Sequence, residues 1–319
     1  MQFSFRFYFM LKLSRLLFCS FGVLSISFAL TSCSTFDPPT VVPSYGHIDS
    51  IHFSIPADSA NLEGSASSAI KAAWVYLDDN PVGTFQMPCT FPIVAGSGYH
   101  NIKIYSGVEA ADANSAYSIN PFYQFYSINV NLQQGKTTKF QPVSTYYNWV
   151  KFKYMENFDG ESPGSQPQHI VRYYGGGSKA AGSDTVMFVT RNKSLVFDGT
   201  GSNGSGLVKL DENHTQYVGM TDPPDSLPYN GTPVYLEFNY RTTTFFSVGL
   251  FEEDTVIQIS PSTIVYPSST WKKLYVDLYS RTISTYHAYP NNYRVYFLMN
   301  YNTGDVADTL LLDNIKIIY

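Results

Sequence analysis

The residues that could perform acid–base or metal chemistry are few and scattered along the 319-residue chain. Glu252, Glu253 and Asp254 are consecutive, whereas the two carboxylates that hydrolyse a glycosidic bond must flank the sugar. We therefore predict a solvated turn for these three acids.

The six histidines show no metal-ligand spacing, and neither H-E-x-x-H nor G-x-S-x-G occurs. The glycine motif at 199–204 lies between two expected strands and opens no helix, so it predicts a hairpin loop. The sequence shows no catalytic centre and predicts a protein that is not an enzyme.

Tyrosines beside glycine-rich or asparagine-rich stretches are the best candidates for ligand contact. A tyrosine ring can stack on a sugar while neighbouring amides hydrogen-bond to its hydroxyls. The candidate ligand residues are Tyr173, Tyr174, Tyr286, Tyr289, Asn291 and Tyr293. The alternative is that these rings pack within the tyrosine-rich strands and have no ligand. Trp271 is expected to pack in a core or at its rim.

The N-terminal 32 residues have the pattern of an export signal. Arg6, Lys12 and Arg15 precede an apolar run at 16–29, which is shorter than the ~20 residues that a spanning helix needs. The following residues 30–33, LTSC, resemble the bacterial lipobox, which implies that Cys33 receives a lipid after cleavage. Ser34 follows the cysteine, and by resemblance to Gram-negative sorting rules it favours the outer membrane; the periplasmic and the extracellular face both remain open.

Removal of residues 1–32 would take the formal net charge from −5 to −8, because that segment holds three basic residues and no acidic ones. No basic patch is visible in the remainder, so a nucleic-acid partner is not expected. The partners expected are a membrane, through the lipid anchor, and a glycan or an outer-membrane protein.

Six Asp-(Ser/Thr)-aliphatic triplets resemble the acceptor sequence of a general O-glycosylation system in one group of Gram-negative bacteria. The candidate acceptors are Ser50, Ser59, Thr185, Ser226, Thr255 and Thr309. The alternative is turn chemistry, since Asp-Ser and Asp-Thr commonly open turns before strands.

The remaining sequence predicts an all-β protein with two β-sandwiches. Residues 33–46 are proline-rich and are expected to be an extended tether. Residues 47–148 alternate in polarity in the manner of strands, and the stretch 72–107 resembles a PEGA-type β-repeat. The matching residues are Val75, Leu77, Asp78, Gly83, Gly98, His100, Ile102 and Ile104. The resemblance implies a small envelope β-sandwich in which His100 is packed or bonded to a turn.

Residues 149–319 show eight or more apolar stretches separated by turn signals, the pattern of a two-sheet sandwich. Between 154 and 319 the layout resembles jelly-roll carbohydrate-binding modules and the galactose-binding-like fold, with ENFDG at 156–160, Trp271 and LLLDNIKIIY at the end. By that resemblance Asp159 and Asp313 are candidates to share a structural Ca²⁺, an ion that prefers oxygen ligands. The alternative for Asp313 is a carboxylate bonded to backbone amides.

The sequence thus favours a lipid-anchored envelope protein whose jelly roll binds a glycan or another envelope component. One alternative is a structural or adhesion subunit of an outer-membrane complex. The other is a polysaccharide lyase or hydrolase, which would need Arg172, His169 and tyrosines to converge on a concave face.

Overall fold

The computed structural model describes residues 42–109, 111, 117–174, 178–179, 187–191, 204–228, 231–253, 257–258, 262–278 and 292–319. Strands dominate these ranges, and the single helical element within them is the four-residue α2 (Ala60–Glu63). None of the helical structure in these ranges is long and apolar enough to span a bilayer. The predicted all-β class is confirmed.

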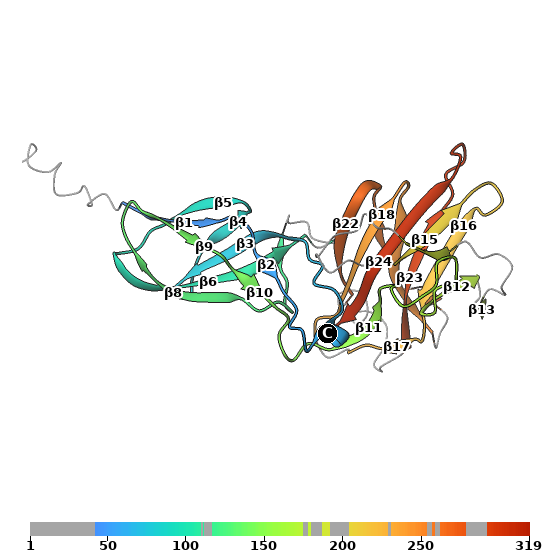
Figure 1. Ribbon diagram of the computed structural model, residues 1–319, viewed down its shortest axis with the longest axis horizontal. Coiled ribbons are helices and arrows are strands. Elements are labelled where there is room, and N and C mark those ends of the chain that lie inside the picture. The colour runs from blue at the N-terminus through green and yellow to red at the C-terminus, as the bar shows by residue number, and fades with distance from the viewer. Residues whose placement is uncertain are drawn as a thin grey trace, which may run out of the picture. The chain divides into compact units, whose positions relative to one another are not determined.

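The first half of the described chain forms three small sheets (Figure 1). Its strands are β1 (Ser44–Ile48), β2 (His52–Phe53), β3 (Ile70–Leu77), β4 (Asn80–Gln86), β5 (Cys89–Ile93), β6 (Gly98–Val108), β7 (Ser118–Ile119), β8 (Tyr126–Leu132), β9 (Thr137–Phe140) and β10 (Val143–Ser144). One sheet has the order β5-β1-β9, a second the order β4-β3-β6-β7 with β8 also paired to β6, and β10 pairs with β2. Because β1 begins at Ser44, residues 44–46 belong to a strand and not to an extended tether.

The alternation expected from the sequence sets the core of this first half. Val75 of β3 and Ile102 and Ile104 of β6 are at most 1% exposed and lie in one apolar cluster with Phe91. The turn that joins β3 to β4 is held by Asp78, whose carboxylate accepts the Asn101 N–H at 2.8 Å. His100 Nδ1 lies 2.7 Å from the same carboxylate, so His100 is bonded to the turn as expected. The PEGA resemblance itself stays a prediction.

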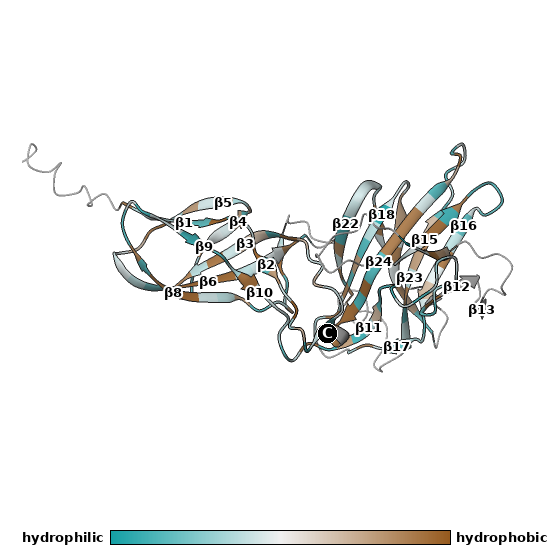
Figure 2. Cartoon of the chain, in the orientation of Figure 1, coloured by the Kyte–Doolittle hydropathy of each residue, from teal (hydrophilic) through white to brown (hydrophobic). Residues whose placement is uncertain are grey.

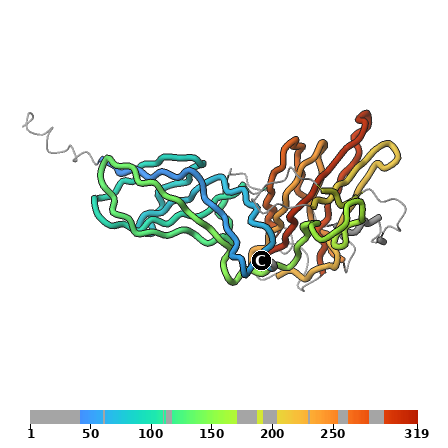
Figure 3. Tube along the Cα trace, in the orientation of Figure 1, coloured from blue at the N-terminus to red at the C-terminus, as the bar shows by residue number. Residues whose placement is uncertain are grey.

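The second half forms two larger antiparallel sheets (Figures 1 and 3). Its strands are β11 (Phe152–Glu156), β12 (Ile170–Tyr174), β13 (Ser178–Lys179), β14 (Met187–Thr190), β15 (Ser205–Leu210), β16 (Gln216–Thr221), β17 (Asp225–Ser226), β18 (Tyr235–Thr242), β19 (Phe246–Glu252), β20 (Ile257–Gln258), β21 (Thr263–Val265), β22 (Ser268–Asp277), β23 (Asn292–Asn300) and β24 (Asp308–Ile318). The six-stranded sheet has the order β14-β15-β24-β18-β22, with β11 also on β24. The eight-stranded sheet has the order β13-β12-β16-β23-β19-β20, with β17 on β23 and β21 on β19.

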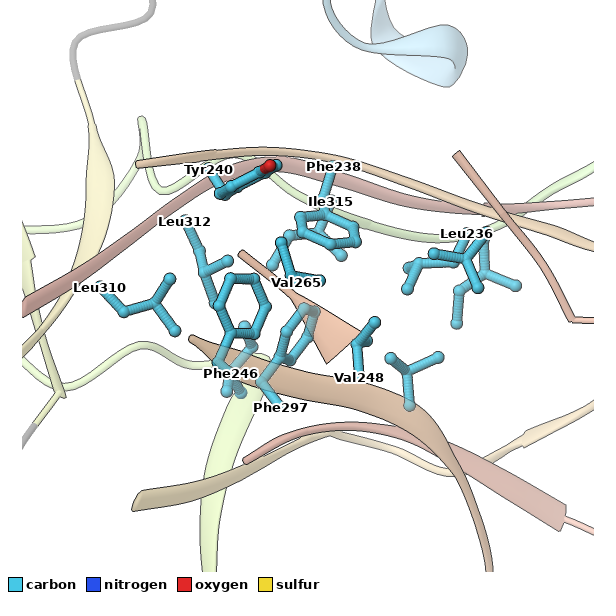
Figure 4. Packing of buried hydrophobic residues seen from close by; sticks show 14 of the residues in the cluster. Leu236, Phe238, Tyr240, Phe246, Val248, Val265, Phe297, Leu310, Leu312 and Ile315 are labelled. Atoms are coloured by element: carbon cyan, nitrogen blue, oxygen red, sulfur yellow. The ribbon is translucent and has the colours of Figure 1, made fainter. Parts of the chain in front are cut away.

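The two large sheets enclose one apolar core, which gives the predicted two-sheet sandwich. Phe238 of the six-stranded sheet packs edge-on against Phe297 of the eight-stranded sheet, with ring centroids 5.5 Å apart (Figure 4). Leu310 and Leu312 of β24 are fully buried in the same cluster, and most of β24 is hydrophobic (Figure 2). Burial of each such side chain contributes roughly 1.5–3 kcal/mol to folding.

Candidate functional site

Of the six predicted ligand residues, Tyr293 is the one whose side chain the structure describes. Tyr286, Tyr289 and Asn291 lie outside the described residues. Tyr173 and Tyr174 belong to β12, where they pair with Lys179 and Ser178 of β13, but their side chains are not described.

Tyr293 is a core residue, and the prediction that it contacts ligand is wrong. Its side chain is 5% exposed and packs in the cluster between the two large sheets. Successive side chains of a strand point to opposite faces. In β23 the core-facing set contains Tyr293, Val295 and Phe297, and the opposite face therefore carries the residues between them.

That opposite face of the eight-stranded sheet, here called the outer face, can be followed across neighbouring strands by register. Leu298 of β23 is opposite Val218 of β16 on one side and Ser247 of β19 on the other. Ser247 is in turn opposite Ile264 of β21. These four residues form one row across four strands, and Ile264, on the strand that pairs only with β19 among the described residues, is 55% exposed.

The next row of the outer face combines two exposed rings with two amides. Gln216 is opposite Asn300, and its Nε2 donates to Asn300 Oδ1 at 2.8 Å. Phe246 of β19 and Val265 of β21 are opposite each other and face the core. Phe245 precedes Phe246 and Tyr266 follows Val265, so both of these rings are on the outer face. Phe245 is 55% exposed and Tyr266 is 72% exposed. We call Gln216, Ser247, Ile264, Tyr266, Phe245 and Asn300 the aromatic–amide platform.

A buried arginine, Arg294, lies on the outer face near the end of β23 that is opposite Asn300. Arg294 is 4% exposed, and its guanidinium donates to both Glu253 oxygens at 2.7 and 3.2 Å. It also donates to Asp222 Oδ1 and to the Thr221 carbonyl, each at 2.7 Å. Charge-assisted hydrogen bonds to the guanidinium hold both carboxylates in place.

This arrangement corrects the prediction for the three consecutive acids. Glu252 is 2% exposed, ends β19 and is opposite Tyr293, so it is not part of a solvated turn. Glu253 does lie in a turn, but it is half-buried and its carboxylate is bound by Arg294. Asp254 lies outside the described residues. The reason is the partner strand, because an arginine on β23 stabilises carboxylates that the local sequence alone would leave in water.

A second group of polar side chains begins at Glu156, the last residue of β11. Glu156, Glu161 and His169 each offer a ligand atom within 4.8 Å of the others. Glu156 is 5% exposed, and burial is the main cause that raises the pKa of its carboxyl group. Its Oε1 accepts the Phe158 N–H at 2.7 Å, and its Oε2 lies 3.0 Å from His169 Nδ1. An imidazole in the set does not match the all-oxygen shell that Ca²⁺ prefers.

The two aspartates suggested for calcium are not part of this group. Asp159 is exposed and accepts the Gly204 N–H at 2.8 Å, whereas Asp313 is fully buried and accepts the Asn314 N–H at 2.7 Å. A shared Ca²⁺ stays a prediction, and the backbone bond of Asp313 matches the alternative given for it.

The remaining sequence candidates are placed as follows. His169 pairs with Glu156, while the side chain of Arg172 is not described, so no convergence of the two on a concave face is seen in the described part. Ser50 and Ser226 are exposed, and Ser59 and Thr309 are half-buried. Thr185, Thr255 and Cys33 lie outside the described residues.

The sequence signal for the platform is weak, which explains why the pattern of residues did not reveal it. Phe245 and Phe246 are adjacent, and only the pairing of β19 with β21 and β23 decides which ring faces the core. Chemically, the platform offers flat apolar faces beside amide donors and acceptors and a hydroxyl, the groups that meet the faces and hydroxyls of a sugar ring.

Comparisons with known proteins give fold likeness and no family. No protein-family model matches the chain, and no curated protein matches it. Among solved structures, a family 30 carbohydrate-binding module of a cellulosomal cellulase of Clostridium thermocellum is 15% identical, with 51% of this chain and 96% of that chain covered and a TM-score of 0.34. A structure described for carbohydrate-binding modules of the β-sandwich superfamily is 12% identical, with 80% and 86% covered and a TM-score of 0.34. The enzymatically active domain of a tailspike protein from bacteriophage CBA120 is 12% identical, with 46% and 18% covered and a TM-score of 0.31. At these scores the likeness carries no argument about what this chain binds.

Proposed function

We propose that the chain is a non-catalytic glycan-binding protein of the bacterial cell envelope, and that its aromatic–amide platform is the binding surface. The observation that carries the proposal is the pair of exposed rings, Phe245 and Tyr266, on one sheet face beside the bonded amides of Gln216 and Asn300. Exposed rings that gather on one face, rather than scatter singly, mark interaction sites.

The platform has a composition that suits a neutral polysaccharide better than a charged ligand. Its six residues carry no formal charge, and Arg294, which lies on the same face, is already bound to Glu253 and Asp222. Stacking on the rings would supply affinity, while the amides would select the orientation of the sugar hydroxyls.

The lipobox at residues 30–33 supports attachment of the protein to the outer membrane through Cys33. An anchor at the N-terminus and a proline-rich stretch after it would hold the β-sandwiches near the bilayer surface.

The test is a glycan array followed by calorimetry, with a chain that begins at Ser34 and therefore lacks the lipidated cysteine. The expected result is saturable binding to at least one neutral polysaccharide, and this binding should be lost in a Phe245→Ala/Tyr266→Ala double variant. Absence of binding across plant, algal, fungal and bacterial polysaccharides would refute the proposal. Copurification with an outer-membrane protein through the platform would then favour the structural-subunit alternative, and shortening of a polysaccharide during incubation would favour the lyase or hydrolase.

A further inference from the structure

The six-stranded sheet carries a polar group on the face turned away from its core. In β18, Glu237 and Asn239 alternate with the core residues Leu236 and Phe238. Neighbouring β22 places Lys273 opposite Asn239. Glu237 and Asn239 are 0% exposed, and the side chain of Lys273 is 0% exposed as well. Three groups of complementary reactivity are therefore enclosed together on adjacent strands (β18 and β22 in Figure 1).

Lys273 is poorly satisfied for a buried cation. Its Nζ lies 3.1 Å from Glu237 Oε2, yet it makes no hydrogen bond of acceptable geometry. A lysine ammonium has three N–H donors, and buried donors in folded proteins are almost always bonded. The comparison within this sheet is Lys316 of β24, which is opposite Glu237 on the other side and donates to the Ser65 carbonyl at 2.8 Å. The deficit is thus specific to Lys273.

Asn239 is held as an oriented electrophile. Ser67 Oγ donates to Asn239 Oδ1 at 3.0 Å, and Asn239 Nδ2 lies 2.9 Å from the same Oγ. A donor on Oδ1 draws electron density from the amide carbon and stabilises the oxyanion that forms when a nucleophile adds to it. Residues directly opposite on antiparallel strands have Cβ atoms about 4.5–5.5 Å apart, which is within the reach of a lysine side chain.

Glu237 is placed to move protons between the other two groups. Tyr146 donates to its Oε2 at 3.1 Å, and the Tyr123 hydroxyl lies 3.5 Å from its Oε1. Burial raises the pKa of both tyrosines well above the usual value, so both hydroxyls stay protonated.

We propose that Lys273 and Asn239 join in an intramolecular isopeptide bond. Glu237 takes a proton from the Lys273 ammonium, and the free Nζ adds to the Asn239 amide carbon, whose oxygen is stabilised by Ser67. Nζ then gives up a second proton, and both protons pass through Glu237 to Nδ2 as the bond from the Asn239 carbon to Nδ2 breaks, so that one ammonium ion departs and Glu237 ends as a carboxylate. The product is a secondary amide from Nζ to the Asn239 side-chain carbonyl, with no oxidant, reductant or other reactant involved.

The bond would resolve the anomaly at Lys273. It removes the buried positive charge and two of the three donors, and leaves one N–H that Glu237 can accept. It also ties β18 to β22 covalently in the middle of the sheet.

The experiment is a tryptic map of the full-length purified chain by mass spectrometry. The expected product is a branched peptide that joins residues 210–241 to residues 273–281, lighter than the two linear peptides together by about 17 Da, the mass of ammonia. Trypsin should not cleave after Lys273. Recovery of linear 210–241 at full mass, together with cleavage after Lys273, would overturn the proposal, and this readout needs no variant.

Two variants separate the roles of the residues. Glu237→Gln keeps the size of the side chain but cannot take the proton, so its soluble fraction should yield only linear peptides. Lys316→Arg, a change of the other lysine beside Glu237, should leave the branched peptide at the wild-type yield. A branched peptide in Glu237→Gln at the wild-type yield would remove Glu237 from the mechanism, and one lost in Lys316→Arg would show that the reacting lysine is misassigned.

Discussion

The exposed ring of Tyr266 provides the sharpest quantitative test of the platform. Tyr266→Ala removes a ring that lies on the outer face one position beyond β21 and is 72% exposed. Because the ring makes few contacts with its own protein, the substitution should change the free energy of unfolding by no more than about 0.5 kcal/mol. Any larger effect on binding would then come from the lost contact with the ligand.

The expected loss of affinity follows from the area of the ring. A tyrosine side chain presents on the order of 200 Å², of which 72% is free here, and a flat sugar covers one of its two faces. About 70 Å² of apolar contact at about 25 cal/mol per Å² gives about 1.8 kcal/mol, a roughly 20-fold increase in Kd. Calorimetric titration with the best polysaccharide of the array measures it directly.

The matched control is Tyr99 of β6, whose ring is 80% exposed and lies in the other β-sandwich. Tyr99→Ala removes a similar area of exposed ring and should leave Kd within about twofold of the wild type. The reasoning fails if Tyr266→Ala binds as tightly as the wild type, or if the two variants lose affinity equally.

Four further substitutions test other parts of the chain. Glu237→Leu should lower the free energy of unfolding by about 3–5 kcal/mol, because Lys273 can then form no amide and its ammonium stays buried without a counter-charge; Glu237→Leu combined with Lys273→Met should be more stable in urea titrations than Glu237→Leu alone, because it removes that charge. The pKa of Glu156 is raised in the folded state, so above pH 4.5 the native state binds more protons than the unfolded state. Thermal stability should therefore fall as the pH rises above 4.5. Glu156→Gln should flatten that part of the stability profile. Tyr293→Ala should cost about 3–5 kcal/mol of stability, as loss of a large core ring does, and at temperatures where the variant stays folded its Kd for polysaccharide should match the wild type. Cys33→Ser should move the full-length protein from the membrane fraction to the soluble fraction, and should abolish incorporation of labelled fatty acid.

Three contrary results would refute the reasoning behind the substitutions at Glu237, Glu156 and Cys33. Equal stability of the single and double variants at Glu237 would show that the buried charge is not the source of the cost. A pH profile unchanged by Glu156→Gln would show that another group titrates in that window. Retention of the Cys33→Ser protein in the membrane fraction, with fatty acid still incorporated, would remove the lipobox assignment.

Local patterns in the sequence were enough to predict the class of fold and much of the core. The alternation of Ile102 and Ile104 predicted buried positions, and both are buried because one face of β6 meets the core. The turn residues were also predictable: the acidic residues and glycine of 78–83 indicate a turn, and Asp78 in it is bonded to His100. These features depend on neighbours within one hairpin or strand, so short-range periodicity and turn chemistry specify them.

The tertiary structure alone decided which tyrosines face solvent and which polar residues are buried. In β23 the outer face carries Tyr296 and Leu298 as well as Arg294, so the polarity pattern did not separate the two faces clearly, and only the assembled sheets show that Tyr293 faces the core. The polarity pattern would place Lys273 and Glu237 on the solvent side of their strands. Only the register of β18 with β22 brings Lys273 Nζ to 3.1 Å from Glu237 Oε2 with both side chains buried. Burial and strand register are properties of contacts distant in sequence, which is why the platform and the buried triad emerge only when the sheets are assembled.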